Sequence, residues 1–138
     1  MSLYVDTSAL VRRYLHDRHR GLVLDAMAEP DAWCASVLVR SEAQLVLHRA
    51  SVSGRQQRAL WSALRDEWEA FWVVPLDERC TARAVELGAT YGLRIMDAIH
   101  LAAADRLPRP VRYLTFERQQ IPAADALGFE VVSPLAVA

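Results

Sequence analysis

The chain has 138 residues, of which 53% are hydrophobic and 24% charged, and its formal net charge at pH 7 is −1. These values predict a single globular domain over residues 1–138 that buries about 70% of its unfolded surface, and they exclude a disordered chain. They also argue against a protein that holds nucleic acid by a large positive charge. No apolar run approaches the roughly 18 residues of a membrane span, and no secretory signal is visible, so we expect a soluble, cytoplasmic protein.

Strands and helices alternate along the chain. Apolar runs predict strands at residues 2–6, 33–36, 71–75, 111–115 and 129–133. The spacing of apolar residues predicts a helix that Ser8 is placed to cap, followed by helices at about 20–28, 36–51, 55–71, 77–91, 93–105 and 117–127. Short strands separated by helices predict an α/β fold with a parallel sheet covered on both faces.

The first predicted strand ends in an acid, Asp6, which two hydroxyl residues, Thr7 and Ser8, follow directly. In open parallel sheets, ligands bind beyond the carboxyl ends of the strands, where the strand order reverses. Asp6 and Thr115 both lie at such ends. We therefore expect them beside a ligand.

Two further acids interrupt apolar patterns. Glu42 shares a helical stripe with Leu38 and Leu45, at a position that the pattern otherwise gives to leucine. Asp97 stands among apolar residues near a helix start, where capping of the helix is the purely structural interpretation.

Convergence of Asp6, Glu42 and Asp97 within about 5 Å would cost about 3 kcal/mol of repulsion per pair at an effective dielectric near 20. Such a cluster either raises the pKa of one acid or binds a hard divalent cation, Mg²⁺ or Mn²⁺. Zinc is disfavoured because the histidines and the two cysteines show no ligand spacing. His100, one turn after Asp97, is expected either to form a hydrogen bond in the site or to pack in the core.

Four separated motifs resemble the PIN-domain ribonucleases, and most closely the VapC toxins of bacterial toxin–antitoxin pairs. They are YVDTSAL at 4–10, VRSEAQ at 39–44, IMDAIHLAAA at 95–104 and LTFERQ at 114–119. The resemblance covers essentially the whole chain and implies a PIN-like three-layer α/β/α fold, with a parallel sheet of about five strands flanked by helices.

The resemblance also implies a site in which an acidic quartet holds one or two Mg²⁺ or Mn²⁺ ions. Its first three members correspond to Asp6, Glu42 and Asp97. The fourth is usually the aspartate of a T-x-D pattern, whereas this chain has Glu117 two residues after Thr115. Glu117 could therefore ligate the ion, bind it through water or point away, and the hydroxyls of Thr7, Ser8 and Thr115 are candidate contacts to metal-bound water.

The expected activity is metal-dependent hydrolysis of RNA phosphodiester bonds by an endoribonuclease, with Asp97 or Asp6 orienting the attacking water. Four arginines near the motifs are candidate phosphate contacts, with a solvated surface position as the alternative: Arg12, Arg13, Arg40 and Arg94.

Partners follow from the same resemblance. It implies a homodimer, neutralised by a VapB-like antitoxin whose C-terminal segment lies near the acids and offers them an arginine. An aromatic stripe formed by Trp61, Leu64, Trp68 and Phe71 either completes the core or makes an interface, and the core is favoured.

Three other functions are compatible with an acidic pocket at the edge of a parallel sheet. A phospho-receiver domain needs a lysine near its acidic pocket, and this chain contains none. A phosphatase of the DxDxT type needs an aspartate where Ser8 stands. A catalytically degenerate PIN domain that binds RNA or protein remains an alternative, supported by Glu117 in place of the usual aspartate.

Overall fold

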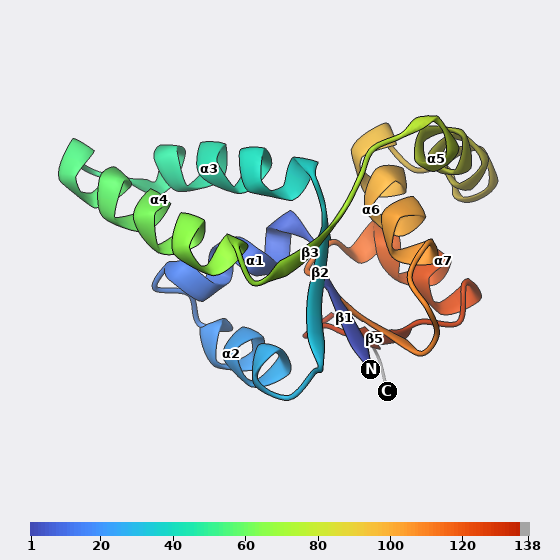
Figure 1. The fold of residues 1–138 in the computed structure, drawn as a ribbon, viewed down its shortest axis with the longest axis horizontal. Coiled ribbons are helices and arrows are strands. Elements are labelled where there is room, and N and C mark those ends of the chain that lie inside the picture. The colour runs from blue at the N-terminus through green and yellow to red at the C-terminus, as the bar shows by residue number, and fades with distance from the viewer. Residues whose placement is uncertain (136–138) are drawn as a thin grey trace.

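The computed structural model describes residues 1–135, and this part of the chain forms one parallel sheet with helices on both sides (Figure 1). The strands are β1 Ser2–Val5, β2 Ala32–Ser36, β3 Phe71–Val74, β4 Val111–Leu114 and β5 Glu130–Val132. The helices are α1 Thr7–Tyr14, α2 Arg20–Ala28, α3 Leu38–Ala50, α4 Gly54–Trp68, α5 Glu78–Tyr91, α6 Ile95–Asp105 and α7 Ile121–Ala126, with a 3₁₀ turn at Arg118–Gln120.

The five strands lie in the order β3-β2-β1-β4-β5, and every neighbouring pair is parallel. The chain builds outward from β1 to β2 and β3, then crosses over to place β4 on the other side of β1. The strand order therefore reverses at β1, and the crevice beyond the carboxyl ends of β1 and β4 is where this class of sheet binds ligands.

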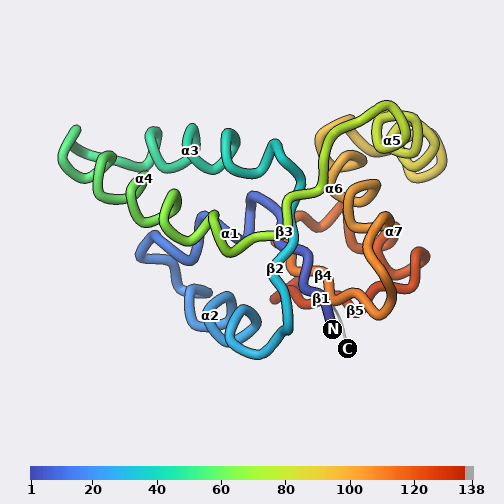
Figure 2. Tube along the Cα trace, viewed as in Figure 1, coloured from blue at the N-terminus to red at the C-terminus, as the bar shows by residue number. Residues whose placement is uncertain are grey.

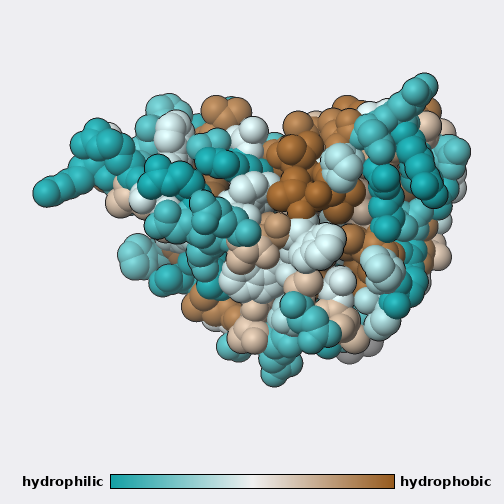
Figure 3. Space-filling model, in the orientation of Figure 1, coloured by the Kyte–Doolittle hydropathy of each residue, from teal (hydrophilic) through white to brown (hydrophobic). Residues whose placement is uncertain are grey.

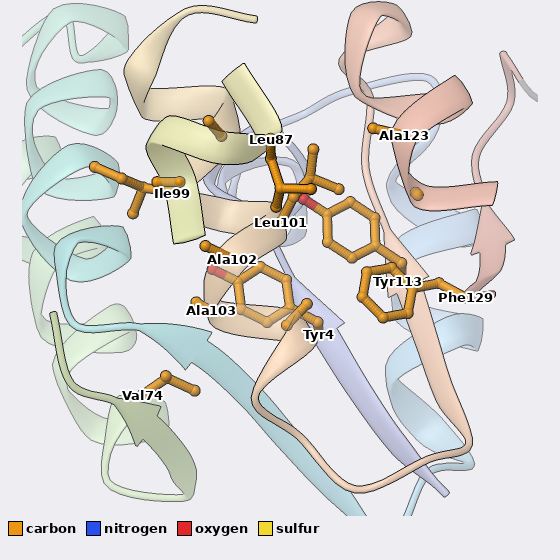
Figure 4. Packing of buried hydrophobic residues seen from close by; sticks show 14 of the residues in the cluster. Tyr4, Val74, Leu87, Ile99, Leu101, Ala102, Ala103, Tyr113, Ala123 and Phe129 are labelled. Carbon is orange, nitrogen blue, oxygen red and sulfur yellow. The ribbon is translucent and has the colours of Figure 1, made fainter. Parts of the chain in front are cut away.

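Helices α1 to α4 cover one face of the sheet and α5 to α7 the other, as Figure 1 and the tube trace of Figure 2 show. Successive side chains of β1 point to opposite faces of the sheet, so Leu3 and Val5 pack with the first group of helices and Tyr4 with the second. On the second face, the rings of Tyr4, Tyr113 and Phe129 lie side by side (Figure 4).

The predicted strands and helices are confirmed in number and order, with two corrections. Ser8 does not cap the first helix: the cap is Asp6, whose side chain accepts a hydrogen bond from the backbone N–H of Ala9, so the helix begins at Thr7. The helix expected at 117–127 is broken, since a 3₁₀ turn precedes a short α7.

The aromatic stripe belongs to the core, as favoured above. Leu64 is fully buried, and Trp61 and Trp68 pack partly buried against the same cluster, while Phe71 has already left the helix for β3. Cys34 and Cys80 are buried free thiols.

Within residues 1–135, no helix has the length and apolar character needed to cross a bilayer. One face of the molecule gathers apolar surface near the segment that joins β3 to α5, flanked by hydrophilic surface (Figure 3). Val37, Val73 and Ile95 are among the exposed apolar side chains of the described residues.

Candidate active site

Four acids from four separate segments line one pocket of about 320 Å³ at the carboxyl ends of the strands. Asp6 follows β1, Glu42 lies in α3, Asp97 in the first turn of α6, and Glu117 just after β4. Two of the acids follow central strands and one lies in a helix of each layer, so the pocket straddles the sheet. The structure thus brings together all four acids that the sequence singled out.

Asp6 is 1% exposed and caps α1. Its Oδ1 accepts hydrogen bonds from Ala9 N at 2.9 Å and from Ser8 Oγ at 2.7 Å, and its Oδ2 accepts one from Thr115 Oγ1 at 2.5 Å. Burial raises the pKa of this carboxyl above its ordinary value, although His100 and the hydrogen bonds act in the opposite direction. A desolvated carboxylate of this kind gains most from a cation.

Thr115 joins β4 to β1 at the reversal of strand order. Its side chain is fully buried, its hydroxyl accepts a hydrogen bond from the backbone N–H of Glu117 at 3.0 Å, and its proton is directed to Asp6. The hydroxyls of Thr7 and Ser8 also donate to acids, Thr7 to Glu42 and Ser8 to Asp6. All three predicted hydroxyl residues therefore hold carboxylates of the site in the structure.

Glu42 reaches the pocket by a different pattern from the predicted one. Leu45, expected on its stripe, is 54% exposed, and the buried stripe of α3 consists of Val39, Ala43 and Leu47. Glu42 borders this stripe, so α3 directs its carboxylate to the pocket without burying it fully. Burial by itself raises the pKa of Glu42, but hydrogen bonds from His100 and Thr7 outweigh it and hold that pKa below its ordinary value.

His100 forms hydrogen bonds in the site, which decides between the two roles left open for it. It is 4% exposed, its Nε2 lies 3.2 Å from Glu42 Oε1, and its Nδ1 lies 3.0 Å from the Tyr4 hydroxyl. Burial lowers the pKa of the imidazole, but Glu42 and the charges of Asp6 and Asp97 outweigh burial and raise that pKa above its ordinary value.

Asp97 is held by two glutamine side chains. Its Oδ1 accepts a hydrogen bond from Gln120 Nε2 at 2.8 Å, and its Oδ2 accepts one from Gln119 Nε2 at 3.3 Å. Gln119 also donates to Glu117 Oε2 at 3.0 Å. Gln120 was missed in the sequence, where it is one polar residue in a polar stretch, yet its side chain is fully buried.

The structure separates the four candidate arginines. Arg12 lines the acidic pocket, whereas Arg13 forms an ion pair with Glu67 on α4, with Nη2 2.6 Å from Oε2. Arg94 lies with Asp97 at a neighbouring pocket. Arg40 lies on α3 outside the lining of either pocket.

The donor set of the pocket suits a hard cation. Carboxylate oxygens are the ligands that Mg²⁺ and Mn²⁺ prefer, and His100, the one histidine lining it, already uses both ring nitrogens. Within residues 1–135, no three His, Cys, Asp or Glu side chains stand as a ready-made metal cage. Mg²⁺ does not require one, because it usually keeps several waters and takes one or two carboxylates together with substrate phosphates.

A second pocket, of about 570 Å³, lies over α5 and α6 and is lined by three arginines, Arg79, Arg83 and Arg106. Arg83 is paired with Glu86 and Asp105, and Arg106 with Asp77. Most of its positive charge is thus neutralised locally, and the acidic pocket is the better candidate for chemistry.

An acidic pocket at the reversal point of a five-stranded parallel sheet, with helices on both faces, defines a PIN-like α/β/α protein. Residues 3–120 match the family described as the PIN domain, so the chain belongs to the PIN-domain family. The family predicted from the four motifs is therefore confirmed.

The chain is also similar to individual PIN proteins over nearly its full length. It is 29% identical to "Ribonuclease VapC47" of Mycobacterium tuberculosis (strain CDC 1551 / Oshkosh), over 98% of each chain. Its fold matches FitAcB from Neisseria gonorrhoeae with a TM-score of 0.75 at 17% identity, covering 98% of this chain and 99% of that one. VapBC-5 of Mycobacterium tuberculosis, a member of the VapBC family of toxin–antitoxin systems, matches with a TM-score of 0.64 at 18% identity, covering 96% and 98%. These matches confirm the expected likeness to VapC toxins.

Proposed function

We propose that this protein is a Mg²⁺- or Mn²⁺-dependent endoribonuclease and the toxin of a VapBC-type toxin–antitoxin pair in the cytoplasm. The observation that carries the proposal is the convergence of Asp6, Glu42, Asp97 and Glu117 on one pocket. Similarity to a protein named a ribonuclease, over 98% of both chains, supports RNA as the substrate.

In this proposal Asp6 and Asp97 hold the ion, with Glu42 and Glu117 as further direct or water-mediated ligands. A bound ion supplies a water of lowered pKa and neutralises the charge that develops on the phosphate. The carboxylate of Asp97 or Asp6 would orient the attacking water, and Thr7, Ser8 and Thr115 keep the acids in place.

An RNA phosphate is repelled by four carboxylates, and the positive charge of Arg12 at the pocket offsets this repulsion. Its Nη1 donates to Ser8 O at 2.6 Å, and its guanidinium carbon lies 4.2 Å from the centre of the Phe116 ring. These two contacts fix the guanidinium at the wall of the pocket before RNA arrives, which lowers the entropic cost of binding.

The deciding experiment compares cleavage of cellular RNA by the parent and by Asp97→Asn, each with Mg²⁺, Mn²⁺ or EDTA. The proposal expects cutting that requires the ion and is lost in the folded variant. A parent that cuts no RNA with either ion and binds no Mn²⁺ by calorimetry would refute it.

For partners, we propose a VapB-like antitoxin that places an arginine in the acidic pocket, and a homodimer. An arginine aimed at several carboxylates gains strong charge-assisted hydrogen bonds and would exclude the metal. The exposed apolar side chains near the β3–α5 connection support a dimer surface. Sedimentation of the protein, alone and with the antitoxin, tests both.

A catalytically degenerate PIN domain that binds RNA or protein remains the second candidate. Glu117 in place of the usual aspartate, and the lack of a ready-made metal cage in residues 1–135, favour it. RNA binding that persists in EDTA, with no cleavage under any metal, would identify this function.

A further inference from the structure

Beneath the acidic pocket lie two buried tyrosines from neighbouring strands. Tyr4 of β1 and Tyr113 of β4 are paired in register, are fully buried, and stack with ring centres 5.3 Å apart and planes inclined by 5°. Figure 4 shows the two hydroxyls directed to the same side. A buried hydroxyl without a partner is costly, so each must be matched by another polar group.

The Tyr4 hydroxyl is connected to Glu42 through His100. Its oxygen accepts a hydrogen bond from Ser36 N at 3.0 Å and lies 3.0 Å from His100 Nδ1, so the two rings share a hydrogen bond. A neutral imidazole that accepts at Nδ1 carries its proton at Nε2, an imidazolium carries one on each nitrogen, and Nε2 faces Glu42 Oε1 at 3.2 Å. In both of these states the ring that Tyr4 holds donates to the acid.

The Tyr113 hydroxyl is connected to Asp97 through Gln120 in the same way. It donates to Gln120 Oε1 at 2.7 Å, which fixes the amide so that Nε2 faces Asp97 Oδ1 at 2.8 Å. Gln120 is fully buried at the turn between β4 and α7. Burial of a glutamine lowers stability unless the oxygen and the nitrogen of its amide both form hydrogen bonds, and in Gln120 both do.

We propose that His100 and Gln120 are positioning residues that fix the carboxylates of Glu42 and Asp97, each anchored on one member of the Tyr4–Tyr113 pair. The inference rests on the proposed metal site. It gives two residues outside the four acids the role of orienting the carboxylates that would bind the ion. Partners that orient metal ligands typically change metal affinity or activity by about 10- to 100-fold when they are removed.

The Gln120 branch gives the sharpest test, because it can be removed without leaving an unpaired buried group. The double variant Tyr113→Phe/Gln120→Leu deletes the hydroxyl and the amide together and keeps the stacked ring. If the branch served folding alone, this variant would be less stable than the parent and would bind Mn²⁺ with the affinity of the parent. We expect its unfolding midpoint in EDTA to lie within a few degrees of the parent's and its affinity for Mn²⁺, measured by calorimetry, to fall by about 10-fold.

The His100 branch is tested by rescue. Glutamine can place an N–H donor where His100 Nε2 stands, whereas leucine cannot. We expect His100→Gln to keep Mn²⁺ affinity within about threefold of the parent and His100→Leu to lose about 10-fold. Tyr14→Phe, which removes a tyrosine hydroxyl in the other helical layer, away from both branches, serves as the control and should leave Mn²⁺ affinity unchanged.

Crystal structures of the metal-free parent and of Tyr113→Phe/Gln120→Leu separate this inference from the proposed function. The inference expects the Asp97 carboxylate to rotate or lose order in the variant. An Asp97 that keeps its orientation, or variants of both branches with the Mn²⁺ affinity of the parent, would overturn it. If the parent binds no Mn²⁺ and cuts no RNA, the proposed function fails, and the orientation of Asp97 in the two crystal structures still decides the positioning role.

Discussion

Replacing Arg12 by leucine tests whether the pocket is built for a phosphate. A charge-assisted hydrogen bond contributes about 1.5–3 kcal/mol, which corresponds to about 10- to 150-fold in kcat/KM when each 1.36 kcal/mol is one factor of ten. We expect Arg12→Leu to lose RNA cleavage by that factor. Arg12→Lys, which keeps the charge but not the planar group stacked on Phe116, should fall in between.

The loss of folding stability in Arg12→Leu should be smaller than the loss of transition-state stabilisation, and it can be measured separately. Arg12 gives up one hydrogen bond to Ser8, the contact with Phe116 and a partly exposed pair with Asp17, together about 1–2 kcal/mol of unfolding free energy. A domain with ordinary stability of about 5–15 kcal/mol stays folded after such a loss.

The assay is kcat/KM on a defined RNA oligonucleotide at several salt concentrations, at a temperature where circular dichroism shows every variant folded. Loss of one phosphate contact should also reduce the slope of log affinity against log salt by about 0.7 for a single strand. Arg40→Leu, an arginine change outside the pocket lining, is the matched control. Cleavage by Arg12→Leu within about threefold of this control would refute the assignment.

Three further outcomes are expected. In EDTA the raised pKa of Asp6 makes the folded state bind its proton more tightly than the unfolded state, so this contribution is fully present below the ordinary carboxyl pKa and is lost as pH rises through the folded value. Thermal unfolding from pH 4 to 7 should show a steeper decline in the parent than in Asp6→Asn, in which the raised pKa of His100 still contributes, and equal pH profiles would contradict the reasoning. Glu117→Gln should weaken Mn²⁺ binding while Glu117→Asp retains it, as calorimetry can show; equal affinities for all three proteins would mean that the carboxylate at 117 does not contact the ion. Arg13→Ala should lower the unfolding free energy in urea by about 2 kcal/mol, because its bidentate pair with Glu67 joins α1 to α4, and leave cleavage per folded molecule unchanged.

Local patterns predicted most of the fold because strand and helix periods depend on neighbours in sequence. The five strands and the positions of Asp6, Glu42, Asp97 and Glu117 at one end of the sheet were accessible in this way. The ends of the helices were harder to predict. Asp6 and Ser8 are both good capping residues, and only the direction of their side chains decides which of them caps the helix.

The supporting residues could not be found by pattern. Gln120 follows a strand in a polar stretch, and nothing local shows that a tyrosine and an aspartate will enclose its amide. Tyr4 and Tyr113 look like ordinary strand residues, since the partners of their hydroxyls lie in other elements, His100 of α6 for Tyr4 and Gln120 of the 3₁₀ turn for Tyr113. The exposure of Leu45 likewise depends on where α3 lies against the sheet.

Among the strands of residues 1–135, β1 is made before the other four and lies in the middle of the sheet, with β2 on one side and β4 on the other. Asp6 is therefore synthesised 109 residues before Thr115, whose hydroxyl donates a hydrogen bond to its carboxylate. Until β4 has been synthesised and has docked beside β1, the nascent chain lacks one wall of the pocket and the fourth acid. On the proposed function, the order of synthesis keeps each new molecule inert towards the message that encodes it until residues 111–117 have been made and have docked.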